Sequence, residues 1–231
     1  MATRDWISFW DSKHSIYVNA RHHHAHYRRI ADDMRRYVPP DGTVLDYGCG
    51  EALATDRVAV VAGRLVLCEA APTVRAAIAT RSAGNGKIEV RSPEDLAALP
   101  DHSFDIVVMH SVAQYLTPAE LGPLLALFHR LLKPGGLFVL GDVIPLKVSA
   151  VTDVLALLRF GAREGFLTAA LFGLVRTVFS SYSRLRTTLG LARYDEKDVL
   201  ATLAAADFVA KRANHNIGHN PERMTFLAWP M

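Results

Sequence analysis

Short apolar runs alternate with helical stretches from residue 43 to residue 142, and this alternation limits the possible folds more than any other feature of the sequence. Each run is long enough for one buried strand, and each stretch between two runs can form a crossover helix. Parallel strands covered by helices on both faces produce this pattern. The runs are 43–48, 64–70, 87–90, 104–110 and 136–142. We therefore predict a sheet with five parallel strands.

The stretch between the last two runs shows the helical period most clearly. From Pro118 to Leu132, leucine and phenylalanine side chains recur at spacings of three and four, which predicts an amphipathic helix. The tetrapeptide Lys-Pro-Gly-Gly at 133–136 contains residues that end helices. We expect it to stop this helix and to turn the chain into the fifth strand.

The C-terminal part follows a different pattern. Residues 195–206 are predicted to form a helix with Asp195 as its N-cap, and strands are predicted at 208–213 and 223–229. About ten residues separate these two strands, too few for a crossover helix, so we expect them to pair antiparallel. The predicted fold is an α/β, three-layer, doubly wound and mostly parallel seven-stranded sheet with an antiparallel C-terminal hairpin edge, plus N-terminal helices and a helical insertion.

The first strand leads into Val-Leu-Asp-Tyr-Gly-Cys-Gly-Glu-Ala at 44–52, which places two glycines at the edge of the sheet where parallel folds bind ligands. Without Cβ atoms, Gly48 and Gly50 permit a tight turn and a close approach of the backbone to a ligand. Glu69, at the end of the second strand, lies 23 positions after Asp46. An acid at that position can accept both hydroxyl groups of a ribose, so we expect a nucleoside ligand.

The dinucleotide fingerprint Gly-x-Gly-x-x-Gly is incomplete here, because Leu53 stands three residues after Gly50. Three acids, Asp46, Glu51 and Glu69, would surround the ligand, whereas a pyrophosphate prefers bare amides and a positive dipole. These residues therefore predict a cationic nucleoside as the ligand.

The segment Asp46-Tyr-Gly48-Cys-Gly50-Glu-Ala52 resembles the first motif, acid-x-Gly-x-Gly-x-Gly, of the class I S-adenosylmethionine-dependent methyltransferases, with Ala52 in place of the third glycine. The resemblance extends over about residues 40 to 142 and continues to the closing hairpin. Its other motifs are LCEAAP at 67–72, SPEDLAALPDHSFDIVVMHSVAQYL at 92–116 and LLKPGGLFVLGD at 131–142. It implies a Rossmann-like fold, S-adenosylmethionine as the cofactor and S-adenosylhomocysteine as the product.

The resemblance also assigns roles to individual residues around the cofactor. Asp46, Gly48 and Gly50 would face its methionine part. Glu69 would bind the ribose hydroxyl groups, and Ala70 would lie beside the adenine.

The adenine end departs from the pattern of the family. The family often places an aspartate at the position of Ser92, followed by a residue whose backbone amide meets the ring. Ser92 is a weaker acceptor, and Pro93 has no amide hydrogen. We expect Glu94 or Asp95 to bind the adenine instead, while the alternative for Asp95 is to cap the turn at Leu96.

The residues after the fourth strand would lie nearest the chemistry. By the same resemblance, His110 and Ser111 would flank the cofactor near its methyl group. A sulfonium is a strong electrophile, so the protein has to supply alignment and, for an ammonium or phenol acceptor, a base that titrates near neutrality. We expect His110, His26 and Tyr17 beside the transferred methyl group, with His26 or His110 as the base.

Four histidines lie close together in Ala-Arg-His-His-His-Ala-His at 20–26. If residues 19–37 are helical, His22 and His26 share one face of the helix. This helix would either cover the cofactor pocket or present a solvated face. Two histidines at this spacing could hold a metal ion, but no third ligand is identifiable, so we expect no metal.

Two further segments have more than one interpretation. The polar run 214–226 is either a turn secured by asparagine side chains, some way from the methyl group, or a segment that recognises substrate. The segment 146–194 carries one lysine and six arginines against Asp153 and Glu164, a net charge of +5, with apolar residues at helical spacing. It would form a cap over a small substrate, a dimer surface, or a basic and apolar patch for anionic lipid.

We expect one domain over residues 1–231. Its parts are an N-terminal helical cover at 1–40, a cofactor-binding core at 41–144, a helical cap at 145–194, and the last helix with the closing hairpin at 195–231.

The predicted function is methyl transfer from S-adenosylmethionine to an oxygen or nitrogen nucleophile of a small molecule. The alternatives are a lipid or quinone methyltransferase at a membrane surface, with peripheral contact through 146–194, and a non-catalytic protein that binds the cofactor as a partner or regulator. A net charge of +3 without a basic block argues against nucleic acid. Two cysteines, no signal sequence and no long apolar span favour a cytoplasmic protein. The sequence leaves open whether it is a monomer or a homodimer.

Overall fold

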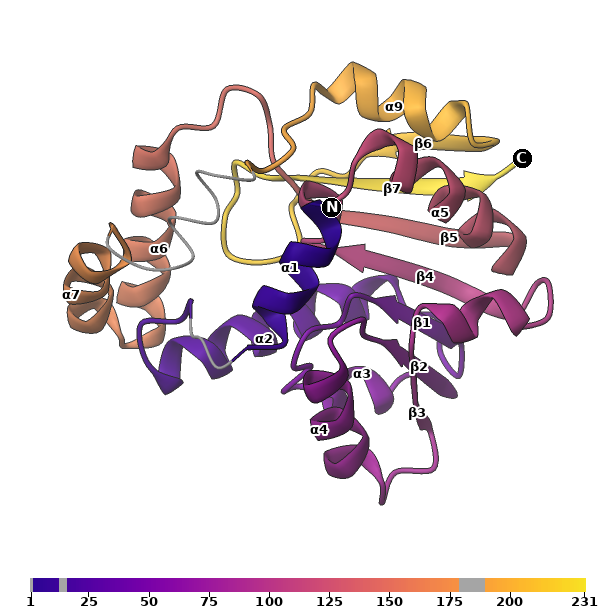
Figure 1. Ribbon diagram of the computed structural model, residues 1–231, viewed down its shortest axis with the longest axis horizontal. Coiled ribbons are helices and arrows are strands. Elements are labelled where there is room, and N and C mark those ends of the chain that lie inside the picture. The colour runs from indigo at the N-terminus through magenta and orange to yellow at the C-terminus, as the bar shows by residue number, and fades with distance from the viewer. Residues whose placement is uncertain (1, 13–15, 179–189) are drawn as a thin grey trace.

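The computed structural model describes residues 2–12, 16–178 and 190–231 (Figure 1). Its centre is a seven-stranded sheet with the order β3-β2-β1-β4-β5-β7-β6. The strands are β1 Thr43–Tyr47, β2 Arg64–Cys68, β3 Ile88–Arg91, β4 Phe104–His110, β5 Leu132–Val143, β6 Phe208–Arg212 and β7 Met224–Pro230. Strands β1 to β5 run parallel, and β7 lies antiparallel between β5 and β6. The predicted fold class, including the antiparallel edge, is confirmed.

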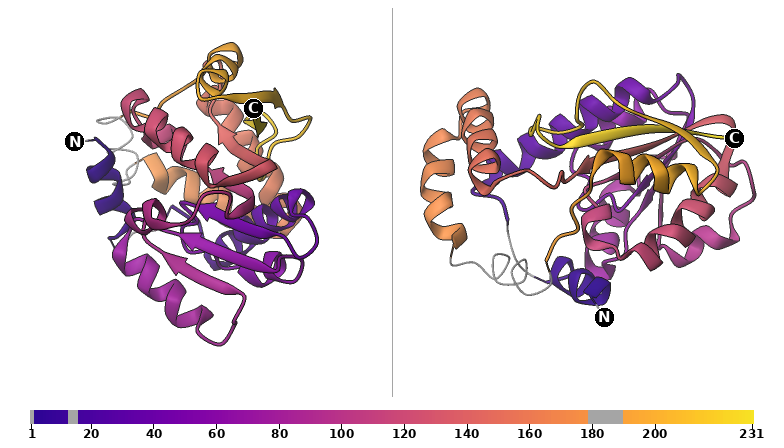
Figure 2. Two further views of the ribbon diagram at one scale, coloured as in Figure 1. Left: turned by 90° about the vertical axis from the view of Figure 1, so that its right-hand side faces the viewer. Right: turned by 90° about the horizontal axis from the view of Figure 1, so that it is seen from above.

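Helices cover both faces of this sheet and give the fold three layers (Figure 2). The helices are α1 Ala2–Trp10, α2 Ala20–Met34, α3 Thr55–Ala59, α4 Pro72–Ser82, α5 Pro118–Leu131, α6 Ala150–Glu164, α7 Leu167–Val178 and α9 Glu196–Ala204, with short 3₁₀ turns η1 Arg35–Tyr37, η2 Glu94–Ala98 and η3 Ala113–Tyr115. In β4, Val107 and Met109 join the core under α5 and α9. Ile106 and Val108 join the core under α2, α3 and α4, because alternate side chains of a strand point to opposite faces.

The start of β5 differs from the prediction. The strand begins at Leu132, directly after α5 ends, and includes the Lys-Pro-Gly-Gly segment that was expected to be a turn. Leu132 pairs with Phe104, and the next pair is Leu137 with Ile106. The β5 side therefore advances by more residues than the β4 side, and residues 133–136 bulge out of the ladder, with Gly135 at φ +75°.

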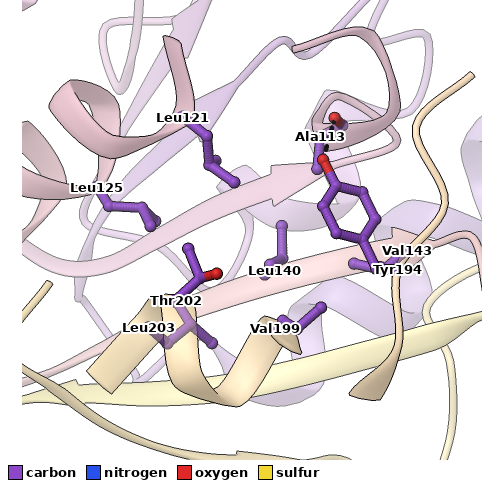
Figure 3. A pocket seen from close by; sticks show the side chains of 9 residues that line it. All are labelled: Ala113, Leu121, Leu125, Leu140, Val143, Tyr194, Val199, Thr202 and Leu203. Atoms are coloured by element: carbon purple, nitrogen blue, oxygen red, sulfur yellow. Dashed lines mark hydrogen bonds between the residues drawn. The ribbon is translucent and has the colours of Figure 1, made fainter. Parts of the chain in front are cut away.

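The two ends of the insertion between β5 and α9 are fastened to each other. The Tyr194 amide donates to Ile144 O at 2.9 Å, and the Leu146 amide donates to Tyr194 O at 3.2 Å. The Tyr194 hydroxyl donates to Ala113 O at 2.9 Å, at one end of a small apolar pocket between α5, β5 and α9 (Figure 3). The side chain of Asp195 then accepts from the Lys197 amide, so the predicted N-cap of α9 is confirmed.

Helices α6 and α7 lie beyond one end of the sheet, as Figures 1 and 2 both show. Gly165, at φ +76°, ends α6 and lets the chain turn into α7. Phe160, Phe166 and Ala170 pack with Ala25 of α2 in a small core of their own. The rest of the predicted helical insertion, residues 179–189, lies outside the described residues.

Among the helices in the described ranges, none has the length and apolar character required to cross a membrane.

Candidate functional site

A cavity of about 1020 Å³ opens at the carboxyl ends of the parallel strands. Its floor is the loop after β1, and its sides are the residues that follow β2 and β4. Helices α1, α2, α3 and α4 contribute further parts of its wall. This is the edge at which open parallel sheets bind their ligands, because the chain connections diverge there.

The predicted glycine loop adopts conformations that require glycine. Gly48 has a φ of +71° and Gly50 a φ of +57°. A Cβ atom at Gly48 would lie 2.3 Å from Val112 Cγ2, and one at Gly50 would lie 2.7 Å from Tyr27 Oη. Ala52, which replaces the third glycine of the motif, also has a positive φ of +45°, a conformation that costs a residue with a Cβ about 1 kcal/mol or more.

Exchange of Gly48 for alanine should lower the free energy of unfolding by about 2 to 4 kcal/mol, since positive φ and the contact with Val112 both oppose a Cβ atom. Urea denaturation of the two proteins measures this difference. Gly84→Ala is the matched control, because no atom lies within 4 Å of its added Cβ. That control should stay within about 1 kcal/mol of the unchanged protein, and an equal loss in both variants would contradict the account of the loop.

Glu69 connects the end of β2 to the glycine loop. Its Oε2 accepts from the Gly50 amide at 2.9 Å, and its Oε1 accepts from the Ala71 amide at 2.8 Å. The side chain is buried, and this burial raises its pKa. Each carboxylate oxygen has a second lone pair, so Glu69 can still accept hydrogen bonds from two hydroxyl groups of a ligand.

Asp46 provides a second acid on the floor of the cavity. Burial, with the nearby charge of Glu69 as a smaller cause, raises the pKa of Asp46 to about 7. Neither carboxylate forms a salt bridge with any residue that the structure describes. Arg75 partly offsets the burial of Glu69, but the pKa of both acids stays raised. Two buried acids of this kind favour a positively charged ligand, because a nearby positive charge stabilises their ionised form.

The histidine-rich helix α2 lies over this cavity and not in open solvent. The Glu51 amide donates to Tyr27 Oη at 2.8 Å, which holds α2 on the glycine loop. The ring of Tyr17 stacks on His23 with centroids 4.1 Å apart. Tyr17, His26 and Tyr27 all line the cavity, so this helix has the position that a cover of the pocket requires. Tyr27 was not among the predicted site residues, although it lies one turn after His23.

Two of the predicted catalytic residues, His26 and His110, differ in their surroundings. Burial, followed by the charges of His219 and His110, lowers the pKa of His26 well below its usual value. His110 Nε2 lies 3.2 Å from the carbonyl oxygen of Ile217. Because a carbonyl oxygen only accepts, this contact places the proton on Nε2 and leaves Nδ1 with a free lone pair.

The asparagine-rich segment 214–226 contributes Arg223 to the cavity, so the alternative that this segment recognises substrate stays open. Strand β7 starts where β5 ends, because the two strands are antiparallel. Asn216 Oδ1 accepts from the Asp142 amide at 3.2 Å, and Asn216 Nδ2 donates to Asp142 Oδ1 at 3.3 Å. Asp142 and Arg223 both line the cavity. The asparagine side chain thus holds the segment next to Asp142, at the edge of the cavity.

Asp142 is a site residue that the sequence analysis missed. It stands directly after buried residues of β5, so its position at the carboxyl end of a parallel strand was a usable signal. Ser111 Oγ donates to Asp142 Oδ2 at 2.7 Å. Both residues have left-handed backbones, with φ of +58° at Ser111 and +60° at Asp142, and strained residues of this kind cluster at functional sites.

Aromatic residues of α1 form a second feature that was missed. Trp6 packs against Tyr115 with ring centroids 4.5 Å apart, and Trp10 packs against the same ring at 6.0 Å. All three side chains line the cavity. The spacing of four residues between the tryptophans places them on one face of the helix, which was the only signal in the sequence.

The structure brings nearly all predicted site residues to one cavity. Those that line it are Tyr17, His26, Asp46, Gly48, Gly50, Glu69, Ala70, Glu94, His110 and Ser111. Asp95 is not part of this lining, and its Oδ2 accepts from the amide and the hydroxyl of Ser92 at 2.9 and 3.0 Å. The position of Asp95 therefore fits the alternative, in which its side chain secures the turn, better than it fits a contact with the ligand. Among the described residues, no three histidine, cysteine or acidic side chains are grouped as metal ligands.

Comparisons with known proteins agree with this geometry. The family model of the methyltransferase domain matches residues 45–140. An uncharacterized methyltransferase of Synechocystis sp. is 30% identical over 112 residues, which are 46% of this chain and 49% of that protein. The match thus spans about half the length of this curated relative.

Solved structures share the fold at low sequence identity. The N-methyltransferase NodS from Bradyrhizobium japonicum, in complex with S-adenosylhomocysteine, has a TM-score of 0.59 at 14% identity, with 99% of this chain and 97% of that chain covered. The magnesium protoporphyrin IX methyltransferase ChlM from Synechocystis, with the same molecule bound, has a TM-score of 0.61 at 13% identity, with 99% and 94% covered. Residues 45–140 are therefore similar to methyltransferase domains, and the seven-stranded sheet of the chain has the fold that these solved structures share.

Proposed function

We propose that this protein transfers a methyl group from S-adenosylmethionine to an oxygen or nitrogen atom of a small molecule. The observation that carries the proposal is the pair of buried acids, Asp46 and Glu69, beside a glycine loop that admits no side chain. Bound S-adenosylmethionine supplies an electrophilic methyl group on a positively charged sulfur. The presence of S-adenosylhomocysteine in structures of NodS and ChlM supports the same cofactor here.

Each acid has a separate task in this proposal. Glu69 is already held by the Gly50 and Ala71 amides, so it presents fixed oxygen atoms to the ribose hydroxyl groups. Asp46 offers negative charge to the cationic end of the cofactor, where any larger residue at Gly48 or Gly50 would block the approach. Glu94, beyond the end of β3, lines the same cavity and is the remaining candidate for the adenine.

The cavity has room for an acceptor as well as a cofactor. Its volume of about 1020 Å³ lies at the upper end of the range of roughly 300 to 1,000 Å³ for small-molecule sites. Its lining combines the aromatic side chains of α1 with polar groups of Asp142, Arg223 and Ser111. Such a lining suits a partly apolar acceptor that is oriented by a few hydrogen bonds.

For an acceptor that must lose a proton, His110 is the better base. Its Nε2 is held by Ile217 O, so the ring has a fixed orientation and Nδ1 is the basic nitrogen. The lowered pKa of His26 keeps its imidazole neutral at pH 7, but the same burial makes it a weak proton acceptor. We assign His26 and Tyr17 to positioning the acceptor in line with the methyl group.

Isothermal titration calorimetry on the purified chain tests the proposed cofactor. S-adenosylmethionine and S-adenosylhomocysteine should each bind at one site, whereas NAD should give no heat because its pyrophosphate would meet Asp46, Glu51 and Glu69. Clear binding of NAD without binding of the two adenosyl compounds would overturn the proposal.

A further inference from the structure

The outer surface of the α6–α7 pair exposes an unusual number of large apolar side chains. Six of the nine exposed large apolar side chains among the described residues lie between positions 146 and 172. They are Leu146, Val151, Leu155, Leu167, Leu171 and Phe172, and we call them the hairpin surface. Phe172 has 80% and Val151 has 66% of its surface accessible. Apolar side chains that gather in one region mark a surface that binds something.

These side chains are exposed because the opposite sides of the two helices are already packed. Phe160 and Phe166 are buried with Ala25 of α2, and the ring of Phe166 stacks on His22 with centroids 4.8 Å apart. Val151 and Leu155 lie one turn apart on α6, as Leu167 and Leu171 do on α7. Each helix therefore has an inner face that fixes it to the protein and an outer apolar stripe that is exposed in the part of the chain that the structure describes.

The charges around the hairpin surface are basic. Both acids of α6 form ion pairs with arginines outside α6 and α7. Asp153 pairs with Arg223 at 3.0 Å, and Glu164 pairs with Arg28. Three basic side chains, Lys147, Arg159 and Arg163, are exposed and form no ion pair with a described residue. Arg159 continues the stripe of Val151 and Leu155 one turn further along α6.

We propose that the α6–α7 pair docks on an anionic lipid surface, with the hairpin surface in the lipid headgroup region and the three basic side chains on lipid phosphates. Apolar helix faces bordered by lysine and arginine bind membranes in this way. A second copy of the chain fits this surface less well, because a twofold interface joins the same patch of both subunits and would bring two groups of basic side chains without ion pairs together. The proposal does not depend on the methyl-transfer chemistry.

Co-sedimentation with lipid vesicles tests the proposal without cofactor or acceptor. The chain should bind vesicles of equimolar phosphatidylglycerol and phosphatidylcholine and bind pure phosphatidylcholine much more weakly. The double variant Leu171→Gln and Phe172→Gln should bind the anionic vesicles about a hundredfold more weakly. Arg159→Gln with Arg163→Gln should weaken binding about twenty-fivefold, since each basic residue near the surface contributes about a fivefold factor.

Val209→Gln provides the matched control, because Val209 is also an exposed apolar residue, with 59% of its surface accessible, but it lies on β6 at the far edge of the sheet. It should bind vesicles as the unchanged chain does, and circular dichroism should show the same thermal transition for all variants. The proposal would be overturned if the double variant Leu171→Gln and Phe172→Gln bound anionic vesicles as tightly as the unchanged chain. It would also be overturned if the unchanged chain bound neutral vesicles as tightly as anionic ones, or did not bind anionic vesicles. Light scattering provides one more test. A dimer that the double variant Leu171→Gln and Phe172→Gln dissociates would also overturn the proposal, since a second copy of the chain would then cover the surface. Because calorimetry with S-adenosylmethionine is a separate measurement, failure here leaves the proposed function standing.

Discussion

Replacing His110 with alanine should lower the rate of methyl transfer by about 10² to 10⁴-fold for an acceptor that must lose a proton, because the chain would lose its best-placed base. The affinity for S-adenosylmethionine should change by less than about threefold, since the fixed acids and the glycine loop remain. The acceptor can be recovered by incubating the chain with S-adenosylmethionine labelled on its methyl group and fractions of a metabolite extract. Transfer rates and calorimetric affinities of both proteins are then compared.

His24→Ala is the matched control for this experiment. His24 belongs to the same histidine run on α2, but it is exposed and does not line the cavity. Its loss should leave the transfer rate within about twofold. His26→Ala should lower the rate less than His110→Ala does, because we assign His26 to positioning. A larger loss at His26 than at His110 would contradict the assignment of the base.

Exchange of Glu69 for glutamine should weaken S-adenosylmethionine binding by about a hundredfold. The change removes a charged acceptor for the ribose hydroxyl groups, and hydrogen bonds to charged groups contribute about 1.5 to 3 kcal/mol each. It also turns an amide NH₂ group towards the Gly50 or the Ala71 amide, both of which now donate to the carboxylate. Calorimetric titration gives the two dissociation constants.

Glu89→Gln controls for the loss of an acid in the same half of the sheet. Glu89 lies on β3, next to β2, and it pairs with Arg64 and Arg91 outside the cavity. Partly exposed pairs of this kind contribute little to stability, so this variant should keep its affinity within about twofold. If Glu69→Gln also kept its affinity, Glu69 would not be the ribose acceptor.

The apolar pattern of the sequence predicted the sheet, because a buried strand requires a run of apolar residues that is visible in its own segment. Strand β4 was predicted at its observed bounds, since a run of apolar residues covered on both faces is visible without knowing its neighbours. The start of β5 was wrong because Lys-Pro-Gly-Gly has the local signature of a turn, whereas its actual form depends on the pairing of Leu132 with Phe104. The two residues of that pair lie far apart in the sequence, so their pairing produces no periodic pattern in the sequence.

Site residues could be predicted where their position follows from the neighbouring sequence, and they were missed where it depends on contacts with distant parts of the chain. Asp46, the two glycines and Glu69 could be predicted, because spacing along β1 and β2 fixes where they end. Trp6 was missed, since its role depends on a contact with Tyr115 from a distant part of the chain. The sequence left two alternatives for segment 214–226, because the distance of this segment from the cavity depends on the pairing of β7 with β5.

If the buried acids of this cavity receive a cation, the affinity for the cofactor must depend on pH, and this dependence is the most direct test. In the unliganded protein the pKa of Asp46 is raised to about 7, so most of its carboxyl groups are protonated at pH 5.5. A bound sulfonium favours the ionised form, so binding at acid pH must release a proton and is weakened.

Calorimetry at pH 5.5 and pH 7.0 should therefore find S-adenosylmethionine binding about tenfold tighter at the higher pH, with proton release detectable by changing the buffer. Asp46→Asn should remove most of this dependence. An affinity that stays constant or falls between pH 5.5 and pH 7.0 in the unchanged chain would contradict the account.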